Sequence, residues 1–236
     1  MKKKLHLFAL LMILGIFSCA KKEDDLVSSE DCQIDCIEIV GKIMTDNGTV
    51  PISDLDLTLQ WDNSYFGSGI IRTKAKTRTN SDGRFYFNFK IRNDELLDGR
   101  FYIVFKLAEE VYLEANLSGI DLDQIARDTT LIINHNIPRI AYLNLTALNL
   151  NEIKQLDYFS AQFDYQVPNG YSQNINGQIR SWNDESNNNN NLIQVSGNQP
   201  IIVSIYRRKN DVLTVEYDTL LIDVGKTVNY TIDFSH

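Results

Sequence analysis

A two-residue alternation of apolar and polar side chains recurs along this chain in short segments, and it constrains the fold more than any other feature. Successive side chains of a β-strand point to opposite faces of the sheet, so this period buries one face of each strand. The clearest apolar sets are Leu55, Leu57, Leu59 and Trp61, followed by Phe85, Phe87 and Phe89. Turn sequences such as Asn80-Ser81-Asp82-Gly83 and Pro168-Asn169-Gly170 separate the segments. The pattern predicts an all-β protein built from two tandem antiparallel β-sandwich domains.

Pro138 interrupts this alternation and predicts a boundary between two domains, residues 37–138 and 139–236. The strands expected in the first domain are 37–43, 55–61, 70–79, 85–89, 101–107, 111–115 and 130–134. Those expected in the second, an immunoglobulin-like sandwich, are 141–148, 158–167, 175–182, 200–207, 212–222 and 227–234. The last two are predicted to form a hairpin that closes a sheet. Two polar stretches, 117–128 and 184–191, are predicted to be exposed, with one helical turn as the alternative for the first.

The N-terminal segment, residues 1–18, resembles a bacterial lipoprotein signal peptide. Three lysines precede an apolar run from Leu7 to Phe17, and a small residue, Ser18, stands directly before Cys19. The run is shorter than the roughly 20 residues that span a bilayer. The resemblance implies that the chain is exported, cleaved and anchored through lipid on Cys19, with palmitate among the acyl groups.

Residues 19–36 are expected to form a lipidated, flexible tether. The stretch Ala20-Lys21-Lys22-Glu23-Asp24-Asp25 resembles the lysine-plus-acid export signal of surface lipoproteins in the Bacteroidota. That resemblance implies a protein anchored in the outer membrane and exposed on the cell surface. A periplasm-facing anchor and a plain solvated tether are the alternatives.

The charge balance excludes some partners. Loss of residues 1–18 takes three lysines from the 23 basic residues and leaves all 31 acidic ones, which gives the mature chain a formal charge of −11. Nucleic acids and anionic lipids are bound by basic stripes, so this balance argues against both. Membrane contact is therefore expected through the lipid anchor, with a protein partner at the outer membrane and carbohydrate as a further candidate ligand.

Cys32 and Cys36 precede the first expected strand. Cα atoms four residues apart lie roughly 13 Å apart in an extended chain, whereas a disulfide tolerates about 4.4–6.8 Å, so a bridge requires a tight turn. An oxidising compartment favours that bridge, and free thiols are the alternative. A zinc site lacks partners, because zinc usually takes four ligands and His135 and His236 are far along the chain. No metal or cofactor is predicted.

The first domain carries a family resemblance. The segments that carry it are Gly41-Lys42-Ile43, Pro51-Ile52, the Leu55 strand and Thr77-Arg78-Thr79-Asn80-Ser81-Asp82-Gly83-Arg84-Phe85-Tyr86-Phe87. Together they resemble the carboxypeptidase regulatory-like, transthyretin-like domain, whose signature is T-x-T-x-x-D-G-x-F-x-F. The resemblance covers roughly residues 37–138. It implies a seven-stranded sandwich that acts as a spacer, docking module or ligand-binding appendage, with no catalytic residues to carry over.

The segment after the second expected strand, 62–69, is longer and more aromatic than a plain hairpin loop. An exposed aromatic ring offers a stacking platform for a sugar. The candidate glycan-binding residues are Trp61, Tyr65 and Phe66, with Tyr171 and Trp182 as a second pair. The interpretation favoured here is that Trp61 belongs to the core, and that Tyr65 and Phe66 cap the end of the sandwich.

The sequence contains no G-x-S-x-G, H-E-x-x-H or phosphate-binding glycine motif. After cleavage only His135 and His236 remain as histidine bases, and neither stands in a catalytic pattern. Paired carboxylates of a hydrolase stay open as a minor alternative, because acidic residues are abundant. We therefore expect a non-enzymatic cell-surface lipoprotein that acts as a protein-interaction or accessory module at the outer membrane. The alternative is a glycan-binding lipoprotein of a polysaccharide-uptake system.

Overall fold

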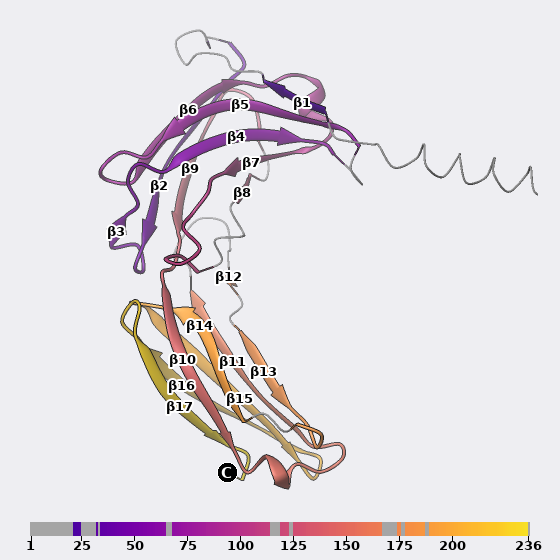
Figure 1. The fold of residues 1–236 in the computed structure, drawn as a ribbon. Coiled ribbons are helices and arrows are strands. Elements are labelled where there is room, and N and C mark those ends of the chain that lie inside the picture. The colour runs from indigo at the N-terminus through magenta and orange to yellow at the C-terminus, as the bar shows by residue number, and fades with distance from the viewer. Residues whose placement is uncertain are drawn as a thin grey trace, which may run out of the picture.

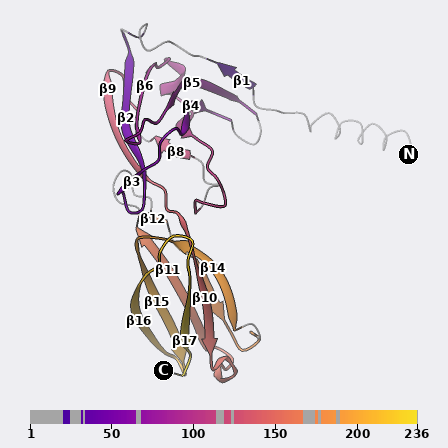
Figure 2. The same cartoon turned by 60° about the vertical axis from the view of Figure 1, so that its left-hand side comes forward.

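The computed structural model describes residues 21–24, 32, 34–64, 68–113, 119–122, 125–166, 174–175, 178–186 and 189–235. Within these ranges the chain is almost entirely β-structure, with two single 3₁₀ turns, η1 (Asp94–Leu96) and η2 (Leu150–Glu152). No helix in the described ranges is long and apolar enough to cross a membrane. The strands form two sandwiches that lie end to end in both views (Figures 1 and 2). The expected all-β sandwich architecture is confirmed.

The first sandwich contains nine strands among the described residues. They are β1 (Lys21–Asp24), β2 (Cys36–Thr45), β3 (Val50–Pro51), β4 (Asp56–Asp62), β5 (Ile70–Arg78), β6 (Arg84–Lys90), β7 (Arg100–Val104), β8 (Gly119–Leu122) and β9 (Thr129–Asn136). One sheet has the order β1-β5-β4-β7-β8. In the other, β6 pairs with β2 antiparallel and β9 pairs with the same stretch of β2 in parallel, so β2 is paired along both edges.

The alternation along β6 behaves as the sequence predicts. Phe85, Phe87 and Phe89 are 4%, 1% and 0% exposed, whereas Tyr86 between them is 43% exposed. The inward rings join Ile and Leu side chains from the facing sheet in one continuous core. This burial is the main source of stability of the sandwich, at about 1.5–3 kcal/mol for each large apolar side chain removed from water.

Two glycines allow close contacts in this sandwich that any other residue would block. A Cβ atom at Gly41 in β2 would lie 1.7 Å from the carbonyl oxygen of Ile133 in β9. Gly83, in the turn before β6, has a φ of +71°, and a Cβ there would lie 2.4 Å from the carbonyl oxygen of Ile43. The turn predicted at residues 80–83 is thus confirmed, and its glycine is needed for both its conformation and its contact with β2.

The second sandwich contains eight strands among the described residues. They are β10 (Ile140–Leu148), β11 (Tyr158–Gln166), β12 (Asn174–Ile175), β13 (Ile179–Trp182), β14 (Asn190–Ser196), β15 (Pro200–Lys209), β16 (Val212–Leu221) and β17 (Thr227–Asp233). One sheet has the order β14-β10-β17, and the other has β12-β11-β15-β16 with β13 also on β11. Its core is separate from that of the first sandwich and includes Phe159, Phe163 and Phe234.

The C-terminal hairpin expected between residues 212–222 and 227–234 is wrong. β16 pairs with β15, and β17 pairs in parallel with β10 in the opposite sheet. The true hairpin turn is Asn210-Asp211, where both residues have positive φ values of 50° and 66°. Such values fit the two-residue hairpin turns that match the twist of the strands. The chain therefore crosses between sheets after β16, which leaves β16 at a sheet edge.

Five other local expectations are corrected. Residues 21–24, expected to belong to the flexible tether, form β1 and pair in parallel with β5. The strand expected at 111–115 is a turn with one isolated bridge, Tyr112 to Arg139, as far as the described residues extend. The stretch 117–128 contains β8 rather than only a loop or helical turn. The segment 175–182 holds two short strands, and the polar run 184–191 leads into an unpredicted strand, β14, which pairs with β10.

A polar cluster joins the two sandwiches at their junction. Asp46, in the turn after β2, is 6% exposed and accepts hydrogen bonds from Arg139 Nε (2.8 Å) and Asn198 Nδ2 (2.7 Å). Burial would raise the pKa of Asp46, but the bonds from Arg139 and Asn198 outweigh it and hold the pKa below its ordinary value. Leu113 and Tyr165 add an apolar contact beside this cluster. The junction therefore fixes the first sandwich against the second through specific contacts.

Candidate functional site

Trp61 does not lie on the surface. Its side chain is 1% exposed, and its indole N–H donates to the carbonyl oxygen of Asp98 at 3.0 Å. The guanidinium of Arg72 lies 4.6 Å from the ring centroid, which covers one face of the indole. Trp61 is therefore a core residue and is withdrawn as a sugar-stacking candidate. Its former partners Tyr65 and Phe66 lie outside the described residues.

Trp182, from the second pair of candidate stacking residues, is also buried. Trp182 is 4% exposed and packs against Phe159, with the ring centroids 5.3 Å apart. It belongs to the core of the second sandwich and is also withdrawn as a stacking candidate. Tyr171, the lipidation candidate Cys19 and His236 lie outside the described residues.

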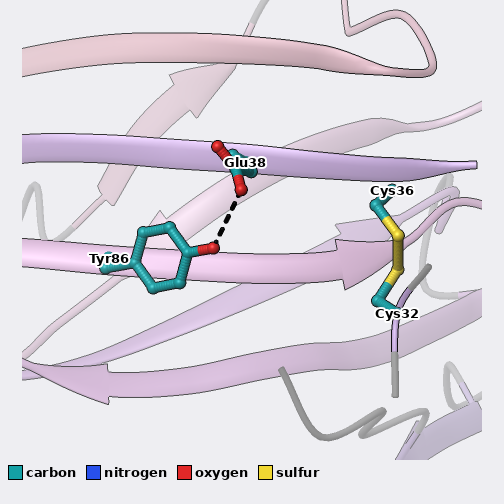
Figure 3. Close-up of a disulfide and its surroundings, with 4 residues drawn as sticks. All are labelled: Cys32, Cys36, Glu38 and Tyr86. Carbon is teal, nitrogen blue, oxygen red and sulfur yellow. Dashed lines mark hydrogen bonds between the residues drawn. A yellow bond between two sulfur atoms is a disulfide. The ribbon is translucent and has the colours of Figure 1, made fainter. Parts of the chain in front are cut away.

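Cys32 and Cys36 are joined by a disulfide, with their Cα atoms 5.8 Å apart. The tight turn that such a bridge requires passes through Asp35, which has a positive φ of 59°. Figure 3 shows the bridge at the start of β2, with Glu38 further along β2 and Tyr86 on the neighbouring β6. The bridge therefore closes the turn directly before β2 and ties Cys32 to the first residue of that strand.

His135 is not placed as a base. Its side chain lies beside the Phe105 ring, with the centroids 6.1 Å apart, and the residue is 8% exposed. Burial lowers the pKa of His135 to about 4, which keeps the imidazole neutral near neutral pH. Among the described residues no group of three His, Cys, Asp or Glu side chains is placed to hold a metal ion.

A buried charge cluster in the first sandwich was missed by the sequence analysis. Lys74 Nζ lies 2.9 and 3.0 Å from the two carboxylate oxygens of Glu95, and both side chains are 0% exposed. Arg72 contributes to the cluster by donating to Asp94 at 2.8 Å and to Glu23 at 3.0 Å. These bonds fasten η1 and β1 to β5. The cluster is a structural tie, and removing one member would leave an uncompensated buried charge.

The edge strand β16 is the most exposed long element of the molecule. It is ten residues long and pairs with β15 over its whole length, and no strand pairs with its other edge among the described residues. It is longer than every other edge strand of the described sheets. Figure 2 shows β16 at the outer side of the second sandwich. A row of main-chain N–H and C=O groups is thereby left on the open edge.

The outer face of β16 is apolar. Leu213, Val215, Tyr217 and Leu221 alternate along the strand and are 60%, 39%, 70% and 70% exposed. Ile202, 39% exposed on the neighbouring β15, extends this face. These residues belong to neither core, and within the described chain their side chains lie beside those of the neighbouring strand on the same sheet face. Exposed apolar strips of this kind commonly mark interaction sites.

The inner face of β16 carries two acids. Glu216 and Asp218 pair in register with the buried Ile205 and Val203 of β15, so all four side chains point to the same side of the sheet. Glu216 accepts a bond from Arg207 (2.7 Å). Inward-pointing charges are a known device that discourages uncontrolled edge-to-edge pairing.

Asp218 is held from two directions. It accepts from the Tyr230 hydroxyl of β17 at 2.9 Å, and its other oxygen accepts from the Thr219 backbone N–H at 2.7 Å. Burial, and then the bond to Asp218, raise the pKa of Tyr230 well above its ordinary value, so the phenol remains protonated and keeps donating. The edge strand is thus tied to the opposite sheet.

The comparisons with known proteins are limited to shape. No protein-family model and no curated protein matches the chain. Solved structures with similar shape include a streptococcal ancillary pilin, with a TM-score of 0.30 and 8% identity over 85% of this chain and 63% of that one. The shaft pilin SpaA from Lactobacillus rhamnosus GG has a TM-score of 0.28 and 9% identity over 85% of this chain and 98% of that one.

An enzyme also appears among these structures. Catechol 1,2-dioxygenase from Acinetobacter matches with a TM-score of 0.27 and 9% identity, over 58% of this chain and 68% of that one. Scores and identities this low support no conclusion about what the present chain binds or does.

Proposed function

We propose that this protein is a non-enzymatic cell-surface lipoprotein that acts as an interaction module, and that it binds a partner protein by adding a strand to the edge of β16. The observation that carries the proposal is the ten-residue open edge with an apolar outer face. In strand addition, main-chain hydrogen bonds supply affinity and alternate side chains supply specificity. β16 offers both, because no strand in the described part of the chain pairs with its outer edge and its two faces differ in chemistry.

The charge of β16 specifies the partner strand. A strand added next to β16 places every second side chain beside Glu216 and Asp218, and the remaining side chains beside Val215 and Tyr217. Opposite charges in directly facing positions are favourable and like charges are unfavourable. The complementary partner is therefore an extended segment in which Lys or Arg alternates with aliphatic residues.

The same charges disfavour pairing of β16 with a second copy of itself. An antiparallel pair that keeps both apolar faces on one side has two registers of greatest overlap. One places Glu216 opposite Glu216, and the other places Glu216 opposite Asp218. Both oppose like charges, so a different protein rather than a second copy is the proposed partner.

A peptide-binding experiment tests this proposal. The probe is a fluorescent ten-residue peptide in which Leu or Val alternates with Lys, and the matched controls carry Glu in place of Lys or a central Pro that removes a main-chain donor. We expect the Lys peptide to bind at least about tenfold more tightly than either control, a difference of about 1.4 kcal/mol. Equal anisotropy changes for all three peptides would contradict strand addition, and dimerisation of the purified protein without peptide would favour a second copy instead.

The cellular location is a separate part of the proposal and rests on the N-terminal sequence. We propose anchoring in the outer membrane through Cys19 with display on the cell surface. A Cys19→Ala variant should lose incorporation of an alkyne-labelled palmitate and leave the membrane fraction. Surface display predicts that protease added to intact cells removes the protein, whereas a periplasm-facing anchor predicts full protection until the outer membrane is opened.

The family assignment of the first sandwich also remains a proposal. Gly41 and Gly83, two glycines of the transthyretin-like pattern, each stand where a Cβ atom would collide with backbone. Those contacts give the pattern a structural reason in this chain and support the assignment of the fold. The proposal gives the chain no catalytic role.

A further inference from the structure

The outward face of the sheet β6-β2-β9 contains two adjoining hollows. The larger, of about 540 Å³, runs from the end of β5 across Arg84 and Tyr86 of β6 to β2 and β9. The smaller, of about 360 Å³, continues towards the turn after β2, at Asn47 and Gly48. Lys42 and Asn134 line both hollows, so the two form one continuous groove. We refer to it as the β2 groove.

The β2 groove is cationic although the protein as a whole is acidic. Lys42, Arg78 and Arg84 line it, and no Asp or Glu is among the described residues that line either hollow. Arg78 is paired with Asp56 at 2.7 Å, whereas Lys42 and Arg84 have no ion pair among the described residues. Lys42 and Arg84 stand directly opposite each other on β2 and β6. Two uncompensated cations side by side in a chain of formal charge −8 favour an anionic ligand.

A buried amide in the smaller hollow has an unused donor. Asn136 is 2% exposed and lines the hollow, and its Oδ1 accepts from the Gly48 N–H at 3.0 Å. Its Nδ2 has no acceptor among the described residues. A buried donor without a partner costs about 1–3 kcal/mol, which an acceptor oxygen on a ligand would recover. The unpaired Nδ2 donor of Asn136 therefore favours a ligand that is rich in oxygen acceptors.

The larger hollow contains an exposed ring. Tyr86 is 43% exposed, and its hydroxyl donates to Glu38 at 3.0 Å, as Figure 3 shows. Burial first, and then the bond to Glu38, raise the pKa of the Tyr86 hydroxyl, so this bond persists and fixes the ring on the sheet. A fixed, exposed aromatic face is suited to stacking against the apolar face of a sugar ring.

The position of the groove excludes strand addition there. β2 is hydrogen-bonded to β6 on one edge and to β9 on the other, so its face presents side chains and no free main-chain ladder. Between Val40 and Met44 the groove extends roughly 13 Å, at about 3.3 Å per residue, which is room for several linked rings. A polymer recognised by side chains fits this surface better than an extended peptide does.

We infer that the β2 groove binds an acidic oligosaccharide, with the sugar carboxylates at Lys42 and Arg84, one ring against Tyr86, and hydroxyl oxygens at Asn134 and Asn136. The ligand class is a saccharide that carries uronic acids. This site lies in the first sandwich and uses none of the residues of the β16 edge, so either proposal can fail without the other.

Calorimetry with the purified protein tests the inference. The probe is tetragalacturonate, and the matched control is the same tetrasaccharide with its carboxyl groups reduced to alcohols. We expect the acidic probe to bind at least about tenfold more tightly than the neutral one, with affinity falling as salt rises. Equal binding of the two sugars, or no binding of either, would overturn the inference.

Variants locate the binding and keep the test specific. Lys42→Gln with Arg84→Gln should weaken binding about tenfold or more, and Tyr86→Ala should weaken it further at constant charge. The control, Lys106→Gln with Lys226→Gln, makes the same change in net charge at exposed positions outside the groove and should leave binding unchanged. If the control variant also loses binding of the acidic sugar, or if a short DNA duplex binds equally tightly, binding depends only on the overall charge. Either result would contradict the inference.

Discussion

The two sandwiches present different chemical groups to a partner. In the first, the central strand β2 is paired on both edges, and its exposed face offers cations, amides and one aromatic ring. In the second, β16 is paired on one edge only and offers an unpaired main chain beside an apolar strip. The contrast teaches that one all-β chain can present two kinds of surface, side chains on a sheet face and unpaired backbone at a sheet edge, and the two proposals assign one mode of recognition to each.

The sandwiches also differ in where they keep charge. The first buries the Lys74–Glu95 pair completely, whereas the corresponding tie in the second, Arg207–Glu216, leaves the Glu216 side chain 58% exposed. Burial of both partners removes solvent screening and makes the loss of one partner costly, whereas a pair whose carboxylate is exposed is partly screened and contributes less, even though the Arg207 side chain is only 7% exposed. The first sandwich therefore depends on its charges for stability, and the second uses its charges at an open edge.

The largest expected effect comes from breaking the buried pair. Glu95→Gln should lower the free energy of unfolding of the first sandwich by about 3 kcal/mol, because Lys74 is left charged and buried. Glu216→Gln, the matched control in the second sandwich, should cost less than about 1 kcal/mol. Urea unfolding followed through Trp61 fluorescence in a Trp182→Phe background measures the first variant, and Trp182 fluorescence in a Trp61→Phe background measures the second. Equal losses in the two variants would remove this difference between the sandwiches.

The junction gives the next effect, and it depends on pH. Asp46→Asn should cost about 1–3 kcal/mol at neutral pH, because a buried carboxylate bonded to Arg139 and Asn198 is replaced by a neutral amide. The pKa of Asp46 is lowered by folding, so its contribution is present above its ordinary pKa of 3.8 and is lost as pH falls through the lower folded value. Urea midpoints of the variant and the parent should therefore converge in strong acid. A constant difference at all pH values would refute the role of the ionised group.

The disulfide is expected to have a smaller effect. Cys32 and Cys36 are four residues apart, so their bridge closes a very short loop and restricts the unfolded chain little. Replacing both by Ser should lower the stability of the first sandwich by about 2 kcal/mol or less. Unfolding of the parent with and without a reductant provides the same comparison. A loss as large as that of Glu95→Gln would mean that the bridge holds more of the sandwich than its own turn.

The smallest effect on stability is expected at the β16 edge. Val215→Lys with Tyr217→Lys should change the free energy of unfolding by no more than about 0.5 kcal/mol, since both side chains are exposed and outside the core. The same double variant should abolish binding of the alternating Lys peptide, because the apolar strip is lost and two cations are added. Destabilisation comparable to that of a core variant would show that the strip supports the fold rather than a partner.

The sequence alone was sufficient for most strands and turns but not for their arrangement. The alternation of Phe85, Phe87 and Phe89 and the turn at Gly83 are local signals, and both were predicted correctly. The pairing of β17 with β10 is nonlocal, and proximity along the chain wrongly favoured β16 as its neighbour. β14 was missed because an asparagine run leads directly into it and masks its short apolar alternation.

The candidate site was less predictable still. Trp61 was named as a stacking candidate from residue type, but its place in the alternation with Leu55, Leu57 and Leu59 favoured a core position, and its burial confirms that interpretation. Lys74 stands in a stretch rich in basic residues, Arg72 to Lys76, which is typical of a solvent-exposed strand, and only the fold brings Glu95 to it. The exposure of β16 follows from the crossing between sheets after Leu221. One local signal did exist, namely apolar residues on one face of β16 opposite acids on the other.

Hydrogen exchange of the β16 amides, measured residue by residue with and without the alternating Lys peptide, tests the central claim most directly. Strand addition predicts that alternate amides of Val212–Leu221 that face the open edge become protected on binding, while those already bonded to β15 change little. Protection confined to another part of the molecule, or binding with no change along β16, would contradict the claim that this edge is the docking site.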